Sequence, residues 1–146
     1  MTTQKSNYCG FTLIEIAITL IVIGILATVI TINLPRSTVN LNTQAELLAN
    51  NIRYTQNLAM TKGERYRFKI STQTNSYSIN NSTIYLDKQT SFGPVTNNLI
   101  IFNSNGIPYI DTKTPLKETA TIALTATDGR TVIITIYPET GSVTYE

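Results

Sequence analysis

The stretch Gly10-Phe11-Thr12-Leu13-Ile14-Glu15, followed by IAITLIVIGILATVITINLP at residues 16–35, decides the fold of this chain. Residues 16–35 carry no charge, and Glu15 is the only charged residue between Lys5 and Arg36. Twenty residues of helix span about 30 Å, the thickness of a bilayer's hydrocarbon core. Because a segment in lipid must satisfy its own backbone hydrogen bonds, this run is predicted to be helical despite its content of Ile, Val and Thr.

Glu15 distinguishes this run from common targeting segments, because an unpaired carboxylate in an apolar setting is unfavourable and needs a partner or a function. A secretory signal peptide would place a small-residue cleavage site after the apolar core, and residues 33–36, NLPR, offer none. A lipoprotein signal would place its cysteine after an apolar stretch, whereas Cys9 precedes one. A plain membrane anchor explains the length of the run and leaves Glu15 unexplained.

The string at residues 10–15, preceded by a polar leader with Lys5, resembles the class III signal of type IV pilins and type II secretion pseudopilins. The resemblance implies that a prepilin peptidase cleaves between Gly10 and Phe11 and that the new N-terminal Phe11 is methylated. Cys9 would leave with the leader. Lys5 fits a leader on the cytoplasmic side of the membrane, with the rest of the chain exported.

The same resemblance offers Glu15 a partner, the α-amino group of Phe11 on a neighbouring subunit. Opposite charges that meet in lipid attract strongly, so their pairing would set the stagger between subunits. The alternative is that Glu15 lies at the level of the lipid headgroups and is solvated.

Residues 36–62 are predicted to form an amphipathic continuation of the helix. Apolar residues recur there at spacings of three and four. They are Leu41, Ala45, Leu48, Ile52 and Ala59. Lys62 followed by Gly63 is a helix stop. We expect one helix from Phe11 to about Lys62, bent but not ended at Gly24 and Pro35.

From residue 64 the pattern changes to strict alternation. Tyr66, Phe68 and Ile70 alternate with basic residues, which is typical of a half-buried strand with a basic outer face. Further short strands are predicted at residues 76–80, 83–87, 98–103 and 107–110, with a hairpin turn at residues 104–106. The Gly93-Pro94 region is predicted to be a loop, and residues 141–145 a last edge strand.

The segments at residues 120–127 and 131–137 are predicted to pair as a hairpin. A two-residue loop, Asp128-Gly129, would place the apolar residues of the two strands on opposite faces. A three-residue loop at 127–129, with Gly129 in the left-handed conformation, pairs Leu124 with Val132 and Ile122 with Ile134. Because it gathers the apolar side chains on one face, the three-residue loop is the predicted one.

The predicted fold class is therefore α+β: a pilin-like long N-terminal helix, first transmembrane and then amphipathic, packed on a small antiparallel β-sheet head. Its segments are a cleaved leader at 1–10, a transmembrane and assembly helix at 11–35, the amphipathic continuation at 36–62 and a β-rich head at 63–146. Three strings are similar to the GspH/FimT group of minor pseudopilins and minor pilins. They are QAELLANNIRYTQNLAMTKG, IFNSNGIPYI and DGRTVIITIYPETGSV. Ser142 stands where that group often has Arg.

Composition excludes the common kinds of catalytic site. The chain has no His and one Cys, so it can build no Cys/His zinc site, Ser-His-Asp triad, Cys-His pair or intramolecular disulfide. Its net charge of +2 gives no case for a dedicated nucleic-acid binder. Calcium ligands usually come in clusters, whereas Asp87, Asp111, Asp128 and Glu139 are scattered singly. We therefore expect neither a metal nor a cofactor.

The remaining candidate site is a basic cluster, which is opposed only by Glu64. Its members are Lys62, Arg65, Arg67 and Lys69. The cluster could contact a partner protein or DNA, but a solvated strand face is the favoured interpretation. DNA-binding minor pilins of the FimT type use a basic C-terminal tail, and residues 138–146 contain no Lys or Arg. Nucleic acid is therefore an unlikely partner.

Together these features predict a non-enzymatic structural subunit, a minor pseudopilin or minor pilin of a type II secretion pseudopilus or a type IV pilus. It would cross the bacterial inner membrane once, hold its head in the periplasm, and assemble with other pilins or pseudopilins through its N-terminal helix after prepilin peptidase cleavage. The alternative is a DNA-binding, FimT-like minor pilin of natural transformation. No constellation of residues supports an enzyme.

Overall fold

The computed structural model describes residues 12–32 and 36–146 and divides the chain into two compact units, Met1–Pro35 and Arg36–Glu146. The described part of the first unit consists of Thr12 and helix α1 (Leu13–Ile32), which passes through Gly24 without ending there. Among the described residues, no helix combines the length and apolarity that crossing a membrane requires. The expected continuity from Phe11 to Lys62 includes residues 11 and 33–35, which lie outside the described residues.

The second unit begins with helix α2 (Arg36–Lys62), whose buried face has the predicted spacing. Leu41, Leu48 and Ile52 lie on this face together with Ala45, Ala49 and Ala59. The alanines matter because a side chain of one carbon lets the helix approach the sheets closely. Gly63, directly after the helix, has φ +68°, the left-handed conformation that commonly ends a helix at glycine.

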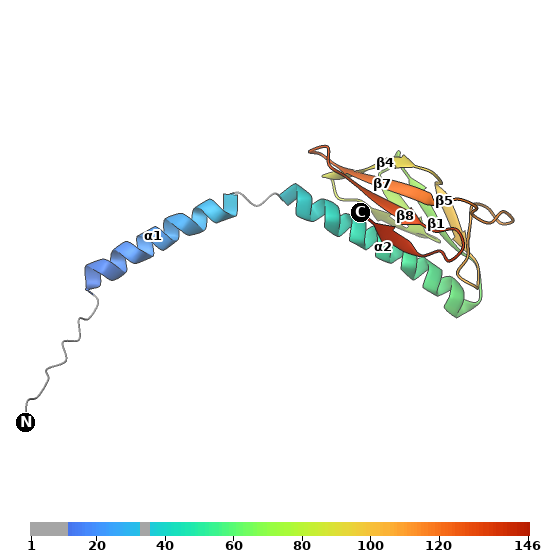
Figure 1. The fold of residues 1–146 in the computed structure, drawn as a ribbon, viewed down its shortest axis with the longest axis horizontal. Helices are drawn as coiled ribbons and strands as arrows, with labels where there is room; N and C mark the ends of the chain where they lie inside the picture. The colour runs from blue at the N-terminus through green and yellow to red at the C-terminus, as the bar shows by residue number, and fades with distance from the viewer. Residues whose placement is uncertain (1–11, 33–35) are drawn as a thin grey trace, which may run out of the picture. The chain divides into compact units, whose positions relative to one another are not determined.

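The rest of the head forms two antiparallel sheets, drawn beside α2 in Figure 1. Sheet A has the strand order β3-β2-β1-β5-β6 and sheet B the order β4-β7-β8-β9. The strands of sheet A are β1 (Tyr66–Ser71), β2 (Ser76–Ile79), β3 (Ser82–Tyr85), β5 (Leu99–Phe102) and β6 (Pro108–Tyr109). Those of sheet B are β4 (Thr90–Val95), β7 (Ala120–Ala126), β8 (Thr131–Ile136) and β9 (Val143–Tyr145). The predicted α+β class, with a helix packed on an antiparallel β head, is confirmed, and the division of the head into two sheets was not predicted.

Strand β1 confirms the predicted alternation. Phe68 and Ile70 are buried, while Arg67 and Lys69 are exposed on the opposite face. The ring of Phe68 stacks on that of Tyr77, with centroids 5.4 Å apart. Both rings belong to the core that α2 and the two sheets share.

The β7–β8 hairpin has the predicted register. Leu124 lies opposite Val132 and Ile122 opposite Ile134. The Ala126 N–H donates to the Arg130 carbonyl at 2.9 Å, which closes the three-residue loop, and Gly129 has φ +86°. Parity of the apolar residues was enough to choose this loop because a shift of one residue would have exposed every core side chain of one strand.

The prediction of a loop around Gly93-Pro94 was wrong, because these residues lie within strand β4. This strand is the outermost one of sheet B. Proline has no backbone N–H to donate, and an edge strand tolerates this because one of its two sides pairs with no other strand. The pairing with β7 is irregular between Phe92 and Val95, which is a bulge that accommodates the proline. Gly93 allows a close approach, since a Cβ there would lie 3.1 Å from the Ala123 Cβ.

Two side chains, those of Asn75 and Gln56, each form two hydrogen bonds that join separate parts of the head. The Asn75 side chain donates to the Thr90 carbonyl at 2.7 Å and accepts from the Phe92 N–H at 3.0 Å, which ties the β1–β2 turn to sheet B. The Gln56 Nε2 donates to the carbonyls of Gly106 at 2.8 Å and Thr140 at 2.7 Å. Gln56 therefore holds α2 against two loops far apart in sequence.

We predict that Gly141→Ala strongly destabilises the head. Gly141 has φ +65°, and a Cβ there would lie 2.5 Å from the Gly106 carbonyl oxygen and 2.6 Å from the Gln56 Nε2. The matched control is Gly129→Ala, where φ is +86° but no atom lies within 4 Å of the added Cβ. The control should lose only the roughly 1–2 kcal/mol of a left-handed alanine.

Thermal unfolding of the full chain in detergent, followed by circular dichroism, tests this prediction. The melting temperature should fall at least about twice as far for Gly141→Ala as for Gly129→Ala. Equal falls would mean that the close contacts around Gly141 do not restrict the site.

Candidate functional site

The N-terminal motif begins at the edge of the described residues. The predicted processing residues, Gly10 and Phe11, lie outside them. Thr12 is the N-cap of α1: its Oγ1 accepts a hydrogen bond from the Glu15 N–H at 3.3 Å, and its carbonyl accepts from the Ile16 N–H at 3.2 Å. Glu15 is the third residue of the helix, so Thr12 and Glu15 stand in the positions of a capping box.

The capping role of Thr12 was missed from the sequence. A Thr followed three residues later by Glu, before an apolar run, is the signal that would have found it. It changes the interpretation of Glu15, because a carboxylate in the first turn is stabilised by the helix dipole whether or not it has a partner. The Glu15 side chain is exposed, and no cation among the described residues pairs with it.

Between Ile16 and Ile25 the surface of α1 carries no charged side chain and exposes large apolar ones. Its large side chains up to Ile25 are between 46% exposed, at Ile16, and 89% exposed, at Leu13. A helix that is apolar all round is normally buried, and a continuous exposed apolar surface marks contact with protein or lipid. The described unit contains nothing that covers this surface.

The structure separates the members of the predicted basic cluster. Lys62 ends α2, while Arg67 and Lys69 project from the exposed face of β1. The guanidinium of Arg65 donates to the Thr112 carbonyl and lies over the ring of Tyr109, 4.9 Å from its centroid. Arg65 therefore fastens the loop after β6 to the start of β1.

Two of these cations share a groove of about 740 Å³. Asn51, Tyr54 and Leu58 line its helical side, and Ile79 and Ile84 line its sheet side. Arg65 and Arg67 are among its lining residues, whereas Lys69 borders a separate hollow over β2 and β3. The structure thus brings together Arg65 and Arg67 and leaves Lys62 and Lys69 apart from them.

A partly buried hydrogen bond holds the wall of this groove in place. The Asn51 Nδ2 donates to the Tyr77 hydroxyl at 2.7 Å, which joins α2 to β2. Burial raises the pKa of the Tyr77 phenol, and the hydrogen bond from Asn51 acts in the opposite direction with a smaller effect. The phenol therefore stays neutral throughout the physiological range.

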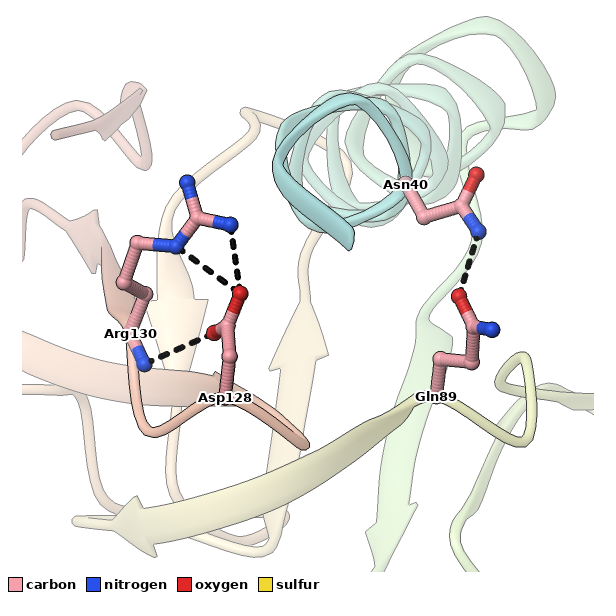
Figure 2. Close-up of polar contacts among 4 residues, drawn as sticks. All are labelled: Asn40, Gln89, Asp128 and Arg130. Carbon is pink, nitrogen blue, oxygen red and sulfur yellow. Dashed lines mark hydrogen bonds and ion pairs between the residues drawn. The ribbon is translucent and has the colours of Figure 1, made fainter. Parts of the chain in front are cut away.

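Two acidic residues of the head, Asp111 and Asp128, hold the turns in which they lie. Asp111 accepts from the N–H groups of Lys113 and Thr114, and these bonds hold the pKa of its carboxyl below the usual value. Asp128 accepts from the Arg130 N–H at 3.1 Å and pairs with the Arg130 guanidinium (Figure 2), which raises the pKa of that guanidinium. In the described ranges, no three acidic, Cys or His side chains are grouped so that they could hold a metal ion.

A second contact in Figure 2 lies near the N-terminal end of α2. The Asn40 Nδ2 donates to the Gln89 Oε1 at 2.9 Å. The Gln89 carbonyl in turn accepts from the Thr127 N–H at 3.0 Å, which joins the loop before β4 to the β7–β8 turn. These are contacts that hold loops in place, with no reactive group among them.

Comparisons with protein families and with solved structures found similarities to this chain. The family described as "Prokaryotic N-terminal methylation motif" matches residues 5–31. Two crystal structures of the type IV minor pilin FimU from Pseudomonas aeruginosa (strain PAO1), in space groups P21 and P65, are similar to the chain at 16% identity, with TM-scores of 0.56 and 0.55. Each covers 73% of this chain, and the chain covers 87% and 92% of them. No curated protein matches the chain.

The chain therefore combines a match to a methylation-motif family at residues 5–31 with a fold, a helix packed on antiparallel sheets, that is similar to that of a type IV minor pilin. The likeness to FimU is one of fold, and it extends over 73% of the chain.

We predict that Thr12→Ala weakens the first turn of α1 by about 1 kcal/mol, whereas Thr12→Ser preserves it. The reason is that alanine removes the oxygen that accepts the Glu15 N–H. Amide hydrogen exchange of the full chain in detergent micelles measures the change, as an exchange rate of the Glu15 amide that rises roughly fivefold in the alanine variant alone. An unchanged rate would show that Thr12 is not the cap.

Proposed function

We propose that this chain is a structural minor pilin or pseudopilin that assembles through residues 11–35 into a type IV pilus or a type II secretion pseudopilus. Residues 1–10 are its leader, residues 11–35 its membrane and assembly helix, residues 36–62 the helix that carries the head, and residues 63–146 the head. It is held in the inner membrane with the head in the periplasm. Its partners are other pilin subunits and the prepilin peptidase.

One observation carries this proposal: the exposed apolar surface of α1 lies within the stretch, residues 5–31, that matches the methylation-motif family. Such a surface is stable only when lipid or other apolar helices cover it. A segment that is first inserted in lipid and then packed among identical segments meets this requirement in both places. The minor-pilin fold of the head is consistent with the same role.

No catalytic step is part of the proposal. Pilins are structural, and the buried polar groups of the head, Thr55, Ser76 and Thr90, are hydroxyls dispersed over α2, β2 and β4. The DNA-binding alternative has no feature of its own to support it, because the C-terminal residues form strand β9 and carry no cation.

We predict that the chain is cut between Gly10 and Phe11. The intact mass of protein from membranes should correspond to residues 11–146 with one added methyl group. Gly10→Val should leave the precursor uncut, because the peptidase needs a residue with little side chain at that position. Gly24→Val, a matched change within α1 where no atom restricts an added Cβ, should be processed normally. A mature chain that begins elsewhere would refute the assignment.

We predict that Glu15 is required for assembly and not for processing. In a bundle of apolar helices an unpaired carboxylate is unfavourable by about 2–3 kcal/mol on insertion scales, and a Phe11 ammonium from a neighbouring subunit offsets this in one axial register only. Glu15→Leu should be cleaved normally and crosslink poorly to other pilin subunits. Glu15→Asp should be intermediate, since its carboxylate is one methylene short.

Glu15→Gln separates this ion pair from the capping role, because glutamine also serves as the third residue of a capping box. If the ion pair sets the register, Glu15→Gln assembles as poorly as Glu15→Leu. If Glu15→Gln assembles like the wild type, Glu15 acts only as a cap, and the ion-pair register is wrong.

A further inference from the structure

We propose that the outer face of sheet A, opposite the buried Phe68 and Ile70, binds a sugar unit that carries a carboxylate, as a uronic acid does. The site is a hollow of about 240 Å³ over strands β1, β2 and β3. It belongs to the head, and the proposal is independent of assembly through the N-terminal helix. The hollow combines a floor of hydroxyl groups, one ammonium group and an exposed tyrosine ring.

The pairing of the strands places the side chains of the hollow in two rows across the sheet. In the first row, Lys69 of β1 lies opposite Ser78 of β2, which lies opposite Thr83 of β3. The second row, two residues further along β1, consists of Ser71, Ser76 and Tyr85. Because side chains alternate between the two faces of a strand and paired residues share a face, both rows lie on the outer face.

The hollow exists because the middle strand carries only small side chains on this face. Strand β2 presents Ser76 and Ser78, while the strands on either side present the longer Lys69 and Tyr85. Neighbouring strands lie about 4.8 Å apart, so the flanking side chains stand on two strands that are roughly 10 Å apart. A trough of this width with serine at its bottom can take one ring-shaped group between the lysine and the tyrosine.

One end of the trough is held by a chain of three hydroxyl groups. The Thr74 Oγ1 donates to the Ser71 Oγ at 2.7 Å and lies 2.7 Å from the Ser76 Oγ. Ser76 is only 4% exposed, so these contacts fix that corner of the floor. The hydroxyls of Ser78 and Thr83, in contrast, form no hydrogen bond with any residue that the structure describes. A ligand can therefore bind both hydroxyls without breaking a contact within the protein.

The charge of the hollow favours an anion. Lys69 is the one charged residue that lines it, and no carboxylate is among the lining residues. Within the described ranges Lys69 takes part in no ion pair. A carboxylate on the ligand would therefore gain a charge-assisted hydrogen bond from the ammonium and would meet no opposing negative charge.

The remaining groups favour a sugar over a bare anion. A hydroxyl both donates and accepts hydrogen bonds, so Ser78 and Thr83 can match sugar hydroxyls in either direction. Tyr85 is 71% exposed, which leaves its ring as a flat apolar surface for the C–H face of a sugar ring. Inorganic phosphate would leave this ring unused. A single-stranded nucleic acid needs several cations along its backbone, and the hollow offers one.

The test measures binding of a trimer of galacturonic acid, labelled with fluorescein at its reducing end, to the full chain by fluorescence anisotropy. The micelles are of a detergent without a sugar headgroup, and a galactose trimer of the same linkage is the neutral control. We expect the acidic trimer to bind at least about tenfold more tightly, because only it can pair with the ammonium. Equal binding of the two trimers, or no binding of the acidic one, would overturn the proposal.

A matched pair of variants tests the ammonium. Lys69→Gln should weaken binding of the acidic trimer about tenfold and change that of the neutral trimer by less than about twofold. Arg67→Gln removes a cation from the same face of the same strand but outside the hollow, and should change both by less than about twofold. Equal losses in the two variants would show that overall charge attracts the trimer, and the proposal would fail.

A second pair tests the tyrosine ring. Tyr85→Ala should weaken binding of both trimers about tenfold, whereas Tyr54→Ala removes a ring on α2 that is 54% exposed and should have an effect of less than about twofold. If Tyr85→Ala binds the acidic trimer like the wild type, or if an equal concentration of inorganic phosphate or single-stranded DNA displaces the trimer, the hollow is not a sugar site.

The floor of the trough is tested by Ser78→Val. Valine removes a hydroxyl and fills the trough with a branched side chain that strands favour, so both trimers should bind at least about tenfold more weakly to a folded head. Circular dichroism of the variant confirms the fold. Unchanged binding to the folded variant would place the ligand elsewhere and overturn the proposal.

Discussion

The close packing of the alanine-bearing face of α2 is the contact on which the rest of the head depends. Neither sheet is large enough to bury its own inner face, and both rest on the same helix. Ala45, Ala49 and Ala59 let the helix backbone approach the strands, while Leu48 and Ile52 fill the space between them. A larger side chain at an alanine position would separate the helix from both sheets at once, because close-packed interiors have little room to adjust.

The polar contacts of the head depend on that packing. Gln56, Arg53 and Asn51 leave the same helix and reach, respectively, two loops, strand β9 and the hydroxyl of Tyr77. The bonds to the Gly106 and Val143 carbonyls and to the Tyr77 hydroxyl are partly buried, where a polar group left without a partner is costly. The apolar face of α2 thus sets the distance between the helix and the sheets. The polar side chains beside that face set the angular position of the helix on the sheets.

The sequence was informative wherever one physical constraint acted alone. Alternation identified β1, parity identified the loop before β8, and the uncharged run with its motif identified α1. It failed at β4, where Gly93 and Pro94 are turn residues by composition but are tolerated at a sheet edge beside a bulge. Whether a strand tolerates these two residues depends on its position in the sheet, and local sequence does not encode the order of the strands. Likewise the sequence grouped four cations, but only the fold shows that two of them share a groove.

The bond between Arg53 and Val143 joins residues that are separated by most of the head. Strands β8 and β9 both contact α2, so part of the apolar face of the helix stays uncovered until the last strands have been synthesised. Contacts between residues so far apart in sequence form slowly, and the waiting helix is exposed to misassociation in the meantime. The order in which the chain emerges therefore makes closure of the head a late event in its folding.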